Sequence, residues 1–142
     1  MSMFTGFRIL SSGMSAQRTR LNVTSSNLAN AQTTRSEEGG AYRRKDPVFA
    51  AIALEGLDSN NPANGELVSV EVTDIVSDDS PLPMVFDPGH PDADENGYVE
   101  MPNVNVIEEM VEMVTASRSF EANATAFQTL RDMMARAIDL GK

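Results

Sequence analysis

The sequence has no cysteine, which excludes disulfide bonds and thiolate metal sites in this chain. It also has little positive charge, because 11 Lys and Arg against 21 Asp and Glu leave a net charge of −10 at pH 7. Nucleic acids and anionic lipid surfaces both select basic proteins, so we expect neither as a partner.

Long apolar runs are missing as well. No stretch approaches the roughly 20 apolar residues of a membrane-spanning helix. Residues 1–10 carry one Arg and no continuous apolar segment, so we expect no cleavable signal peptide. Composition alone would place the chain in the cytoplasm.

The N-terminal part of the chain has the pattern of one long helix. It contains no proline, and apolar residues recur there in alternating steps of three and four, interrupted at Gln17 and Thr24. We predict a helix over residues 4–31, ending where Asn, Gln and Thr residues of low helix propensity follow. The apolar seam of this helix consists of Phe7, Leu10, Met14, Leu21, Leu28 and Ala31.

The C-terminal part predicts a second, longer helix. Asn105 is its expected N-cap, with Glu108 as the reciprocal partner of a capping box, and Gly141 is its expected stop. At 1.5 Å per residue the helix would be about 50 Å long, whereas a domain of this size is about 30 Å across. We therefore expect it to project, or to pack against something besides its own middle module. Its seam includes Met110, Met113, Phe120, Phe127, Met134 and Ile138.

The middle of the chain differs in composition and holds six of the seven prolines. Short apolar stretches with partial alternation predict a few strands separated by turns. The predicted strands cover residues 48–54, 67–76 and 84–86.

These three parts predict a mainly α protein with a small β-rich insertion. A single helix is ordered mainly by packing its apolar face, so neither seam can remain in water. The simplest solution is an antiparallel coiled coil with the chain ends together and the β module at the far end. The predicted divisions are residues 1–35, 36–101 and 102–142.

The two seams have two interpretations. They could form the core of a monomeric helical hairpin. The length of the second helix, and five of the nine Met residues between Met101 and Met134, favour surfaces shared with other chains. A head-to-tail contact that does not close would generate a helical filament.

One acidic stretch partly matches a calcium-binding loop. Asp92, Asp94 and Asn96 occupy the first, third and fifth positions, but the twelfth, which should be Glu, is Asn103. An Asx-rich turn leading into the second helix is therefore favoured over a calcium module. The single histidine, His90, has neither a nucleophile nor further metal ligands in register. We predict no enzyme, no metal, no cofactor and no small-molecule substrate.

Residues 43–45, Arg-Arg-Lys, form a short basic cluster in an acidic chain. The cluster is too small for a nucleic-acid patch and lacks interleaved aromatic residues. The functional interpretation is a contact with an acidic surface of a neighbouring subunit, and the structural one is a solvated strand end.

Residues 25–34, Ser-Ser-Asn-Leu-Ala-Asn-Ala-Gln-Thr-Thr, resemble the amino-terminal signature of the bacterial flagellar rod and hook axial family. Residues 87–110, where a Gly-His-Pro-Asp-Ala-Asp run joins the start of the second helix, are similar to the proximal-rod members, and most of all to the proximal-rod protein C group. The resemblance covers nearly the whole chain and is weakest over residues 55–69. The signature residues are Asn27, Leu28, Ala29, Asn30, Thr33 and Thr34.

Two signature residues invite a structural prediction. Near a helix end, Asn27 and Asn30 can adopt left-handed backbone geometry and cap carbonyl groups. We predict that they mark the exit from the first helix.

The resemblance implies a structural subunit of the proximal rod of the flagellar basal body. Such a subunit assembles helically with copies of itself and other rod subunits, and transmits torque from the membrane ring to the hook. The resemblance also implies export through the flagellar type III apparatus to the periplasm, which replaces the cytoplasmic expectation. Membrane-ring and export-apparatus proteins are further implied partners. The alternative within the family is a distal-rod or hook protein, although those are usually longer.

Overall fold

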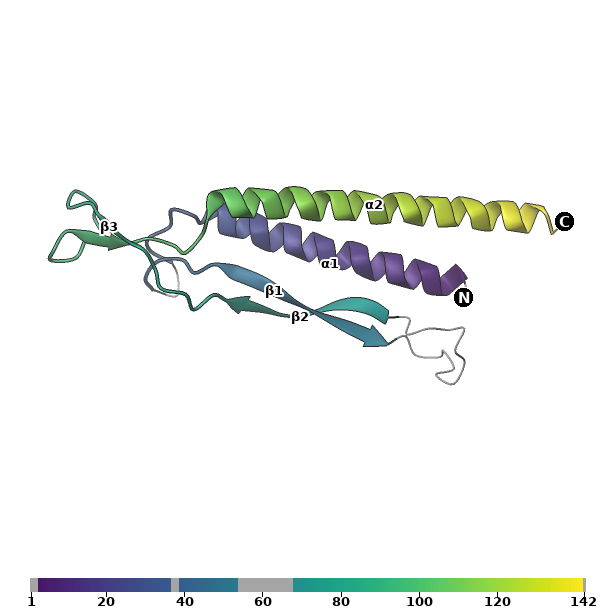
Figure 1. Cartoon of the computed structure of the whole chain (residues 1–142), viewed down its shortest axis with the longest axis horizontal. Coiled ribbons are helices and arrows are strands. Elements are labelled where there is room, and N and C mark those ends of the chain that lie inside the picture. Colours follow the sequence, from purple (N-terminus) through teal and green to yellow (C-terminus); the bar gives the residue numbers. More distant parts are fainter. Residues whose placement is uncertain (1–2, 37–38, 54–67, 142) are drawn as a thin grey trace.

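The computed structural model describes residues 3–36, 39–53 and 68–141. Two long helices run antiparallel, so both chain ends lie at the same end of an elongated molecule (Figure 1). The strands belong to the segment that connects the helices. The predicted class, a mainly α protein with a small β-rich insertion, is confirmed.

Helix α1 spans Met3–Ala29, within two residues of the predicted range at each end. Its two glycines permit close packing on α2, the second helix. A Cβ atom on Gly6 would lie 2.9 Å from Leu130 Cδ2, and one on Gly13 would lie 3.1 Å from Asn123 Nδ2. The absence of side chains at these positions therefore sets how closely the two helices approach.

Helix α2 spans Val106–Asp139, and Asn105 caps it as predicted. The Asn105 Oδ1 atom accepts a hydrogen bond from Ile107 N at 3.1 Å. The capping box is not formed within the described residues, because the exposed Glu108 side chain makes no return bond to Asn105. Leu140 is the C-cap, one residue before the predicted stop at Gly141.

The middle segment forms two antiparallel strand pairs. β1 (Lys45–Ala53) pairs with β2 (Val68–Ser77), and β3 (Met84–Phe86) pairs with β4 (Tyr98–Glu100). The three predicted strands are present, although residues 54 and 67 lie outside the described residues. β4 was not predicted, because it ends in Glu100 and follows directly on turn residues, whereas β3 is a wholly apolar run.

The position of the first strand pair corrects one prediction. The β3–β4 hairpin lies at the far end of the helices, but β1 and β2, which we call the ribbon, turn back along α1 (Figure 1). α1 thus lies between α2 and the ribbon. The Ser12 Oγ atom accepts a hydrogen bond from Val70 N at 3.2 Å, and the Arg20 guanidinium lies 4.5 Å from the centre of the Phe49 ring.

The apolar inner face of the ribbon explains this return. The register opposes Pro47 to Ile75, and Phe49 to Val72 across a bulge that follows Val48. Alternation places these residues on one face, and a two-stranded sheet needs such a face covered to be stable. α1 covers part of this face: Pro47 is buried and Phe49 and Val72 are half-buried, whereas Ile75 is 45% exposed.

Few side chains are fully buried, and some of those are polar. The buried apolar residues are mostly small, whereas Thr24, Asn27 and Glu109 are buried polar residues. No described helix combines the length and apolar character needed to cross a membrane. The buried polar residues gather where α1 ends and α2 begins.

Candidate assembly interface

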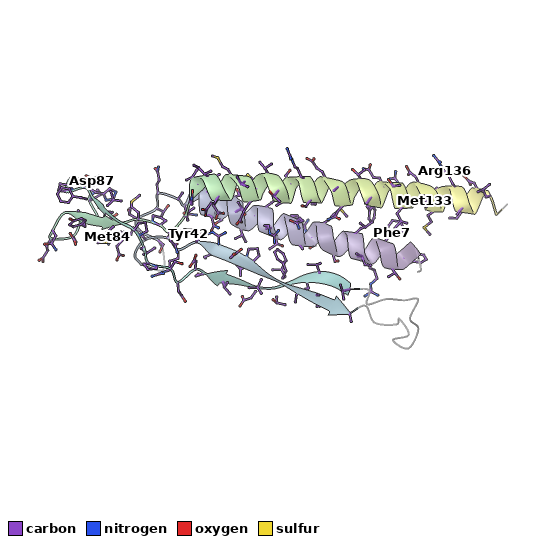
Figure 2. The ribbon with its side chains drawn as sticks, viewed as in Figure 1. Phe7, Tyr42, Met84, Asp87, Met133 and Arg136 are labelled. Carbon is purple, nitrogen blue, oxygen red and sulfur yellow. The ribbon has the colours of Figure 1, made fainter. Side chains whose placement is uncertain are left out.

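The paired helices bring the predicted seams together. The Phe7 and Phe127 rings pack edge to face, with centroids 4.8 Å apart. The seam residues on α1 are half-buried, and so are most of those on α2. Met110 and Ile138 differ, with exposed fractions of 51% and 57%. Figure 2 shows Phe7 beside α2, and Met133 and Arg136 near the C-terminal end of α2.

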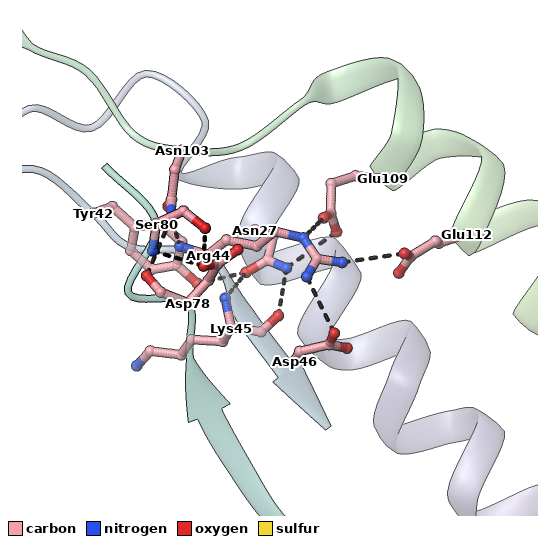
Figure 3. Close-up of polar contacts among 10 residues, drawn as sticks. All are labelled: Asn27, Tyr42, Arg44, Lys45, Asp46, Asp78, Ser80, Asn103, Glu109 and Glu112. Carbon is pink, nitrogen blue, oxygen red and sulfur yellow. Dashed lines mark hydrogen bonds and ion pairs between the residues drawn. The ribbon is translucent and has the colours of Figure 1, made fainter. Parts of the chain in front are cut away.

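Asn27 is the centre of a polar junction between the helices and the ribbon (Figure 3). Its side chain is 1% exposed. The Nδ2 group donates to Lys45 O at 2.8 Å and to Glu109 Oε2 at 3.1 Å. The Oδ1 atom accepts from the Tyr42 hydroxyl at 2.9 Å and from Lys45 N at 3.0 Å. These four bonds use the full capacity of an Asn side chain.

Glu109 joins Arg44 to the same junction. The Arg44 Nε atom donates to Glu109 Oε1 at 2.6 Å, and its Nη atoms reach Asp46 and Glu112 at 3.2 and 3.1 Å. Burial lowers the pKa of the Arg44 guanidinium, but hydrogen bonds to Glu109 and Asp46 outweigh that effect and hold the pKa above its ordinary value. The junction, residues Asn27, Tyr42, Arg44, Lys45 and Glu109, therefore fixes three chain segments relative to one another.

The arginines of the basic cluster bind within their own chain, which corrects the neighbouring-subunit interpretation for Arg44 and leaves it a prediction for the exposed Arg43. Arg44 belongs to the junction, and Arg43 Nη1 donates to the carbonyl oxygens of Asp78 and Ser80, each at 3.3 Å. Asn103 braces the same region, because its Oδ1 atom accepts from Arg44 N at 2.8 Å.

The predicted roles of Asn27 and Asn30 are half right. Among the described residues only glycines have positive φ, so left-handed geometry at either Asn is wrong. The carbonyl-capping role is confirmed for Asn30, whose Nδ2 group donates to Ser26 O at 2.9 Å. Asn27 is helical, and its side chain binds Lys45, Tyr42 and Glu109 in place of a carbonyl of its own helix.

The remaining signature residues surround the end of α1. Leu28 is half-buried and Ala29 is exposed. Thr33 donates to Asn30 Oδ1 at 3.2 Å, and Thr34 donates to Asp92 Oδ2 at 2.8 Å. The signature therefore shapes the exit of α1 and its contact with the loop before β4.

That loop contains the residues with the calcium-like spacing. Asp94 Oδ1 accepts from the backbone N–H groups of Asn96 and Tyr98, both at 2.8 Å, which is an Asx turn. Asp92 binds Thr34, and Asn96 is exposed. The turn leads into β4 before the chain reaches α2. No cluster of three or more His, Asp or Glu suited to a metal ion occurs within the described residues.

The sequence interpretation missed Glu109 and Arg44 as junction residues. Glu109 lies in the first turn of α2, where the helix dipole alone already favours a negative charge. The spacing of Glu109 could have revealed that it is buried. It begins a series with steps of four and three on the face toward α1, continued by Met113, Ala116 and Phe120. A charged residue on an apolar seam requires a buried partner.

The outer face of α2 is apolar and uncovered near its start. Four apolar residues at helical spacing are each more than half exposed there: Ile107, Met110, Val111 and Val114. We call these four residues the α2 stripe. No described Cα atom of the ribbon lies within 8 Å of α2. Contiguous exposed apolar side chains of this kind are typical of protein interaction surfaces.

Comparisons with known proteins define the class of this chain. A family described as flagella basal body rod protein matches residues 7–35. A second family, described as flagellar basal body rod FlgEFG protein C-terminal, matches residues 95–140. The two matches cover α1 and α2, so both ends of the chain are those of flagellar basal-body rod proteins.

Curated relatives match over the full length. The flagellar basal-body rod protein FlgC of Borreliella burgdorferi is 40% identical, covering 97% of each chain. Those of Escherichia coli O6:H1 and Bacillus subtilis are each 39% identical, covering 100% of both chains. The chain therefore belongs to the FlgC family of flagellar basal-body rod proteins, which confirms the resemblance seen in the sequence.

Proposed function

We propose that this chain is a structural subunit of the proximal rod of the bacterial flagellar basal body. The observation that carries the proposal is identity of about 40% to FlgC proteins from end to end. In this role the subunit assembles with copies of itself and with other rod subunits, and it transmits torque from the membrane ring to the hook. It performs no catalysis.

The structure supports a role in assembly through two features. The α2 stripe leaves an apolar surface for another chain. The junction meanwhile fixes the start of α2 against the end of α1, so the stripe is presented on a rigid element. The predicted seam residues other than Met110 and Ile138 are half-buried within the chain and would hold the helix pair that other subunits contact.

The location and further partners follow from the same proposal. The subunit lies in the periplasmic rod and reaches it through the flagellar export apparatus, without a cleaved signal peptide. It contacts membrane-ring proteins on that route or in the finished rod. The distal-rod and hook alternative is disfavoured, because these curated relatives, which match from end to end, are FlgC proteins.

Deletion of the gene tests the proposal. Cryo-tomography of the deleted strain should show membrane rings without rod or hook, and the restored gene should rebuild both. A matched restoration with Phe127→Asp should fail, since a carboxylate at the Phe7 contact prevents helix pairing. Complete basal bodies in the deleted strain would overturn the proposal.

A further inference from the structure

The charges of this chain are separated along the sequence. α1 contains three Arg and no Asp or Glu. Residues 46–117 contain 16 of the 21 acidic residues and no Lys or Arg. α1 is therefore a cationic element beside an anionic middle segment.

The exposed side of α1 is a shallow groove between α2 and the ribbon. Its floor is formed by Ser11 and Ser15, which are exposed, and its apolar wall by Phe120 and Phe127. Arg8 and Arg18 stand near its two ends, about 15 Å apart along the helix axis. Within the described residues neither guanidinium has a carboxylate within 4 Å. We call this surface the α1 groove.

The face of the ribbon that points away from α1 has the opposite charge. Alternation places Asp46, Val48 and Ala50 of β1 on that face, opposite Val76, Asp74 and Glu71 of β2. Val48 and Val76 are 41% and 42% exposed, and the carboxylates of Glu71 and Asp74 are exposed beside them. These six residues form the outer face of the ribbon, and each of its three rungs pairs one apolar side chain with one acidic side chain.

We propose that the outer face of the ribbon in one copy of this chain packs into the α1 groove of a second copy. The inference rests on the proposed function, because it describes a contact inside the rod. Asp46 and Glu71 lie four ladder positions apart, about 13 Å along the ribbon. That spacing is close to the spacing of Arg8 and Arg18 in the groove. Asp46 already pairs with Arg44 of its own chain at 3.2 Å, but its side chain is 54% exposed, so it can share its charge with an arginine of the second copy.

The occupant is a second copy because one chain cannot supply both surfaces to itself. The Phe49 side of the ribbon already packs on its own α1, so the outer face points away from its own groove. Two different surfaces of one protein that meet in this way form a heterologous contact, which extends into a helix unless rotation closes it. The packing also explains why a two-stranded ribbon carries apolar residues on both faces.

Disulfide cross-linking tests this contact directly, because the natural chain has no cysteine. A chain carrying both Ser15→Cys and Val48→Cys places one thiol in the groove and one on the outer face. Basal bodies purified from cells that make this chain, then oxidised, should give a ladder of cross-linked multimers on non-reducing gels. The matched control is a mixture of the two single-cysteine chains, which should give dimers and nothing larger.

The outcomes separate this inference from the proposed function. A chain that is absent from purified basal bodies contradicts the proposed function. A chain that is present in basal bodies but gives no product larger than a dimer overturns the contact. The same result is expected if another axial protein covers either surface, and it overturns the contact in that case too.

Charge reversal provides a second measurement. Arg8→Glu with Arg18→Glu should reduce hook-bearing basal bodies at least about tenfold, and Asp46→Lys with Glu71→Lys should do the same, because like charges then face each other. A chain with all four changes should regain most of the loss. Arg118→Glu, a reversal of an exposed Arg outside the groove, is the control and should have little effect. Failure of the fourfold variant to recover would overturn the pairing.

Discussion

Asn27 and Glu109, 82 residues apart in the sequence, share a buried hydrogen bond of 3.1 Å between Nδ2 and Oε2. The bond joins the last turn of α1 to the first turn of α2. It also connects the family signature to the start of the C-terminal helix, since each residue lies in a segment matched by a different family model. The two ends of the chain thus depend on each other for their polar partners.

Replacement of Asn27 should therefore destabilise the fold. Asn27→Ala removes four hydrogen bonds and leaves the Lys45 backbone, the Tyr42 hydroxyl and Glu109 without this partner. We expect a loss of about 2–4 kcal/mol in the free energy of unfolding, measured by urea denaturation of the purified chain. Asn22→Ala, an exposed change on the same helix, is the control. Equal urea midpoints for Asn27→Ala and Asn22→Ala would show that the junction does not stabilise the fold.

The Glu109–Arg44 pair makes a separate prediction. Glu109→Ala should cost about 3 kcal/mol, because it leaves a half-buried guanidinium that keeps only its exposed partners. Glu108→Ala, an exposed neighbour, should change stability by less than about 0.5 kcal/mol.

A double-mutant cycle isolates the pair. Arg44→Met combined with Glu109→Leu should cost clearly less than the sum of the two single changes, since neither charge is then left alone. Additive losses would show that the two side chains act independently.

The junction also shows where sequence interpretation reached its limit. Long helices were predictable because about thirty residues of regular spacing leave no competing pattern. Glu109 lay on the apolar seam, but a glutamate in a first helical turn already has a sufficient local explanation. Its true partner, Arg44, is 65 residues away and belongs to another element, so local spacing could not identify it.

The return of the ribbon along α1 was unpredictable for a related reason. Val48 and Phe49 are adjacent and point to opposite faces, and both are apolar. Alternation then cannot tell which face is covered by the chain itself. The bulge after Val48 shifts the register of β2, and only the paired strands reveal it.

The α2 stripe predicts a loss of assembly without a loss of folding. Val111 is 61% exposed, so Val111→Lys should change the free energy of unfolding by less than about 0.5 kcal/mol. The same variant should fail to support swimming, because a desolvated lysine in a subunit contact has no partner. Circular dichroism of the purified chain and swarm diameter on soft agar measure the two effects. Full motility would show that the stripe faces solvent in the rod.

Gln17 provides the last prediction, because its Oε1 atom is buried and has no hydrogen-bond partner among the residues that the structure describes. An unpaired buried acceptor costs about 1–3 kcal/mol, so Gln17→Met, which keeps the length of the side chain, should stabilise the purified chain by about 1 kcal/mol. Gln32→Met, at an exposed position beyond α1, should have no effect on the urea midpoint. A destabilised Gln17→Met chain would mean that the amide is satisfied in solution. If Gln17→Met is more stable yet impairs motility, the amide finds its partner in another subunit of the rod.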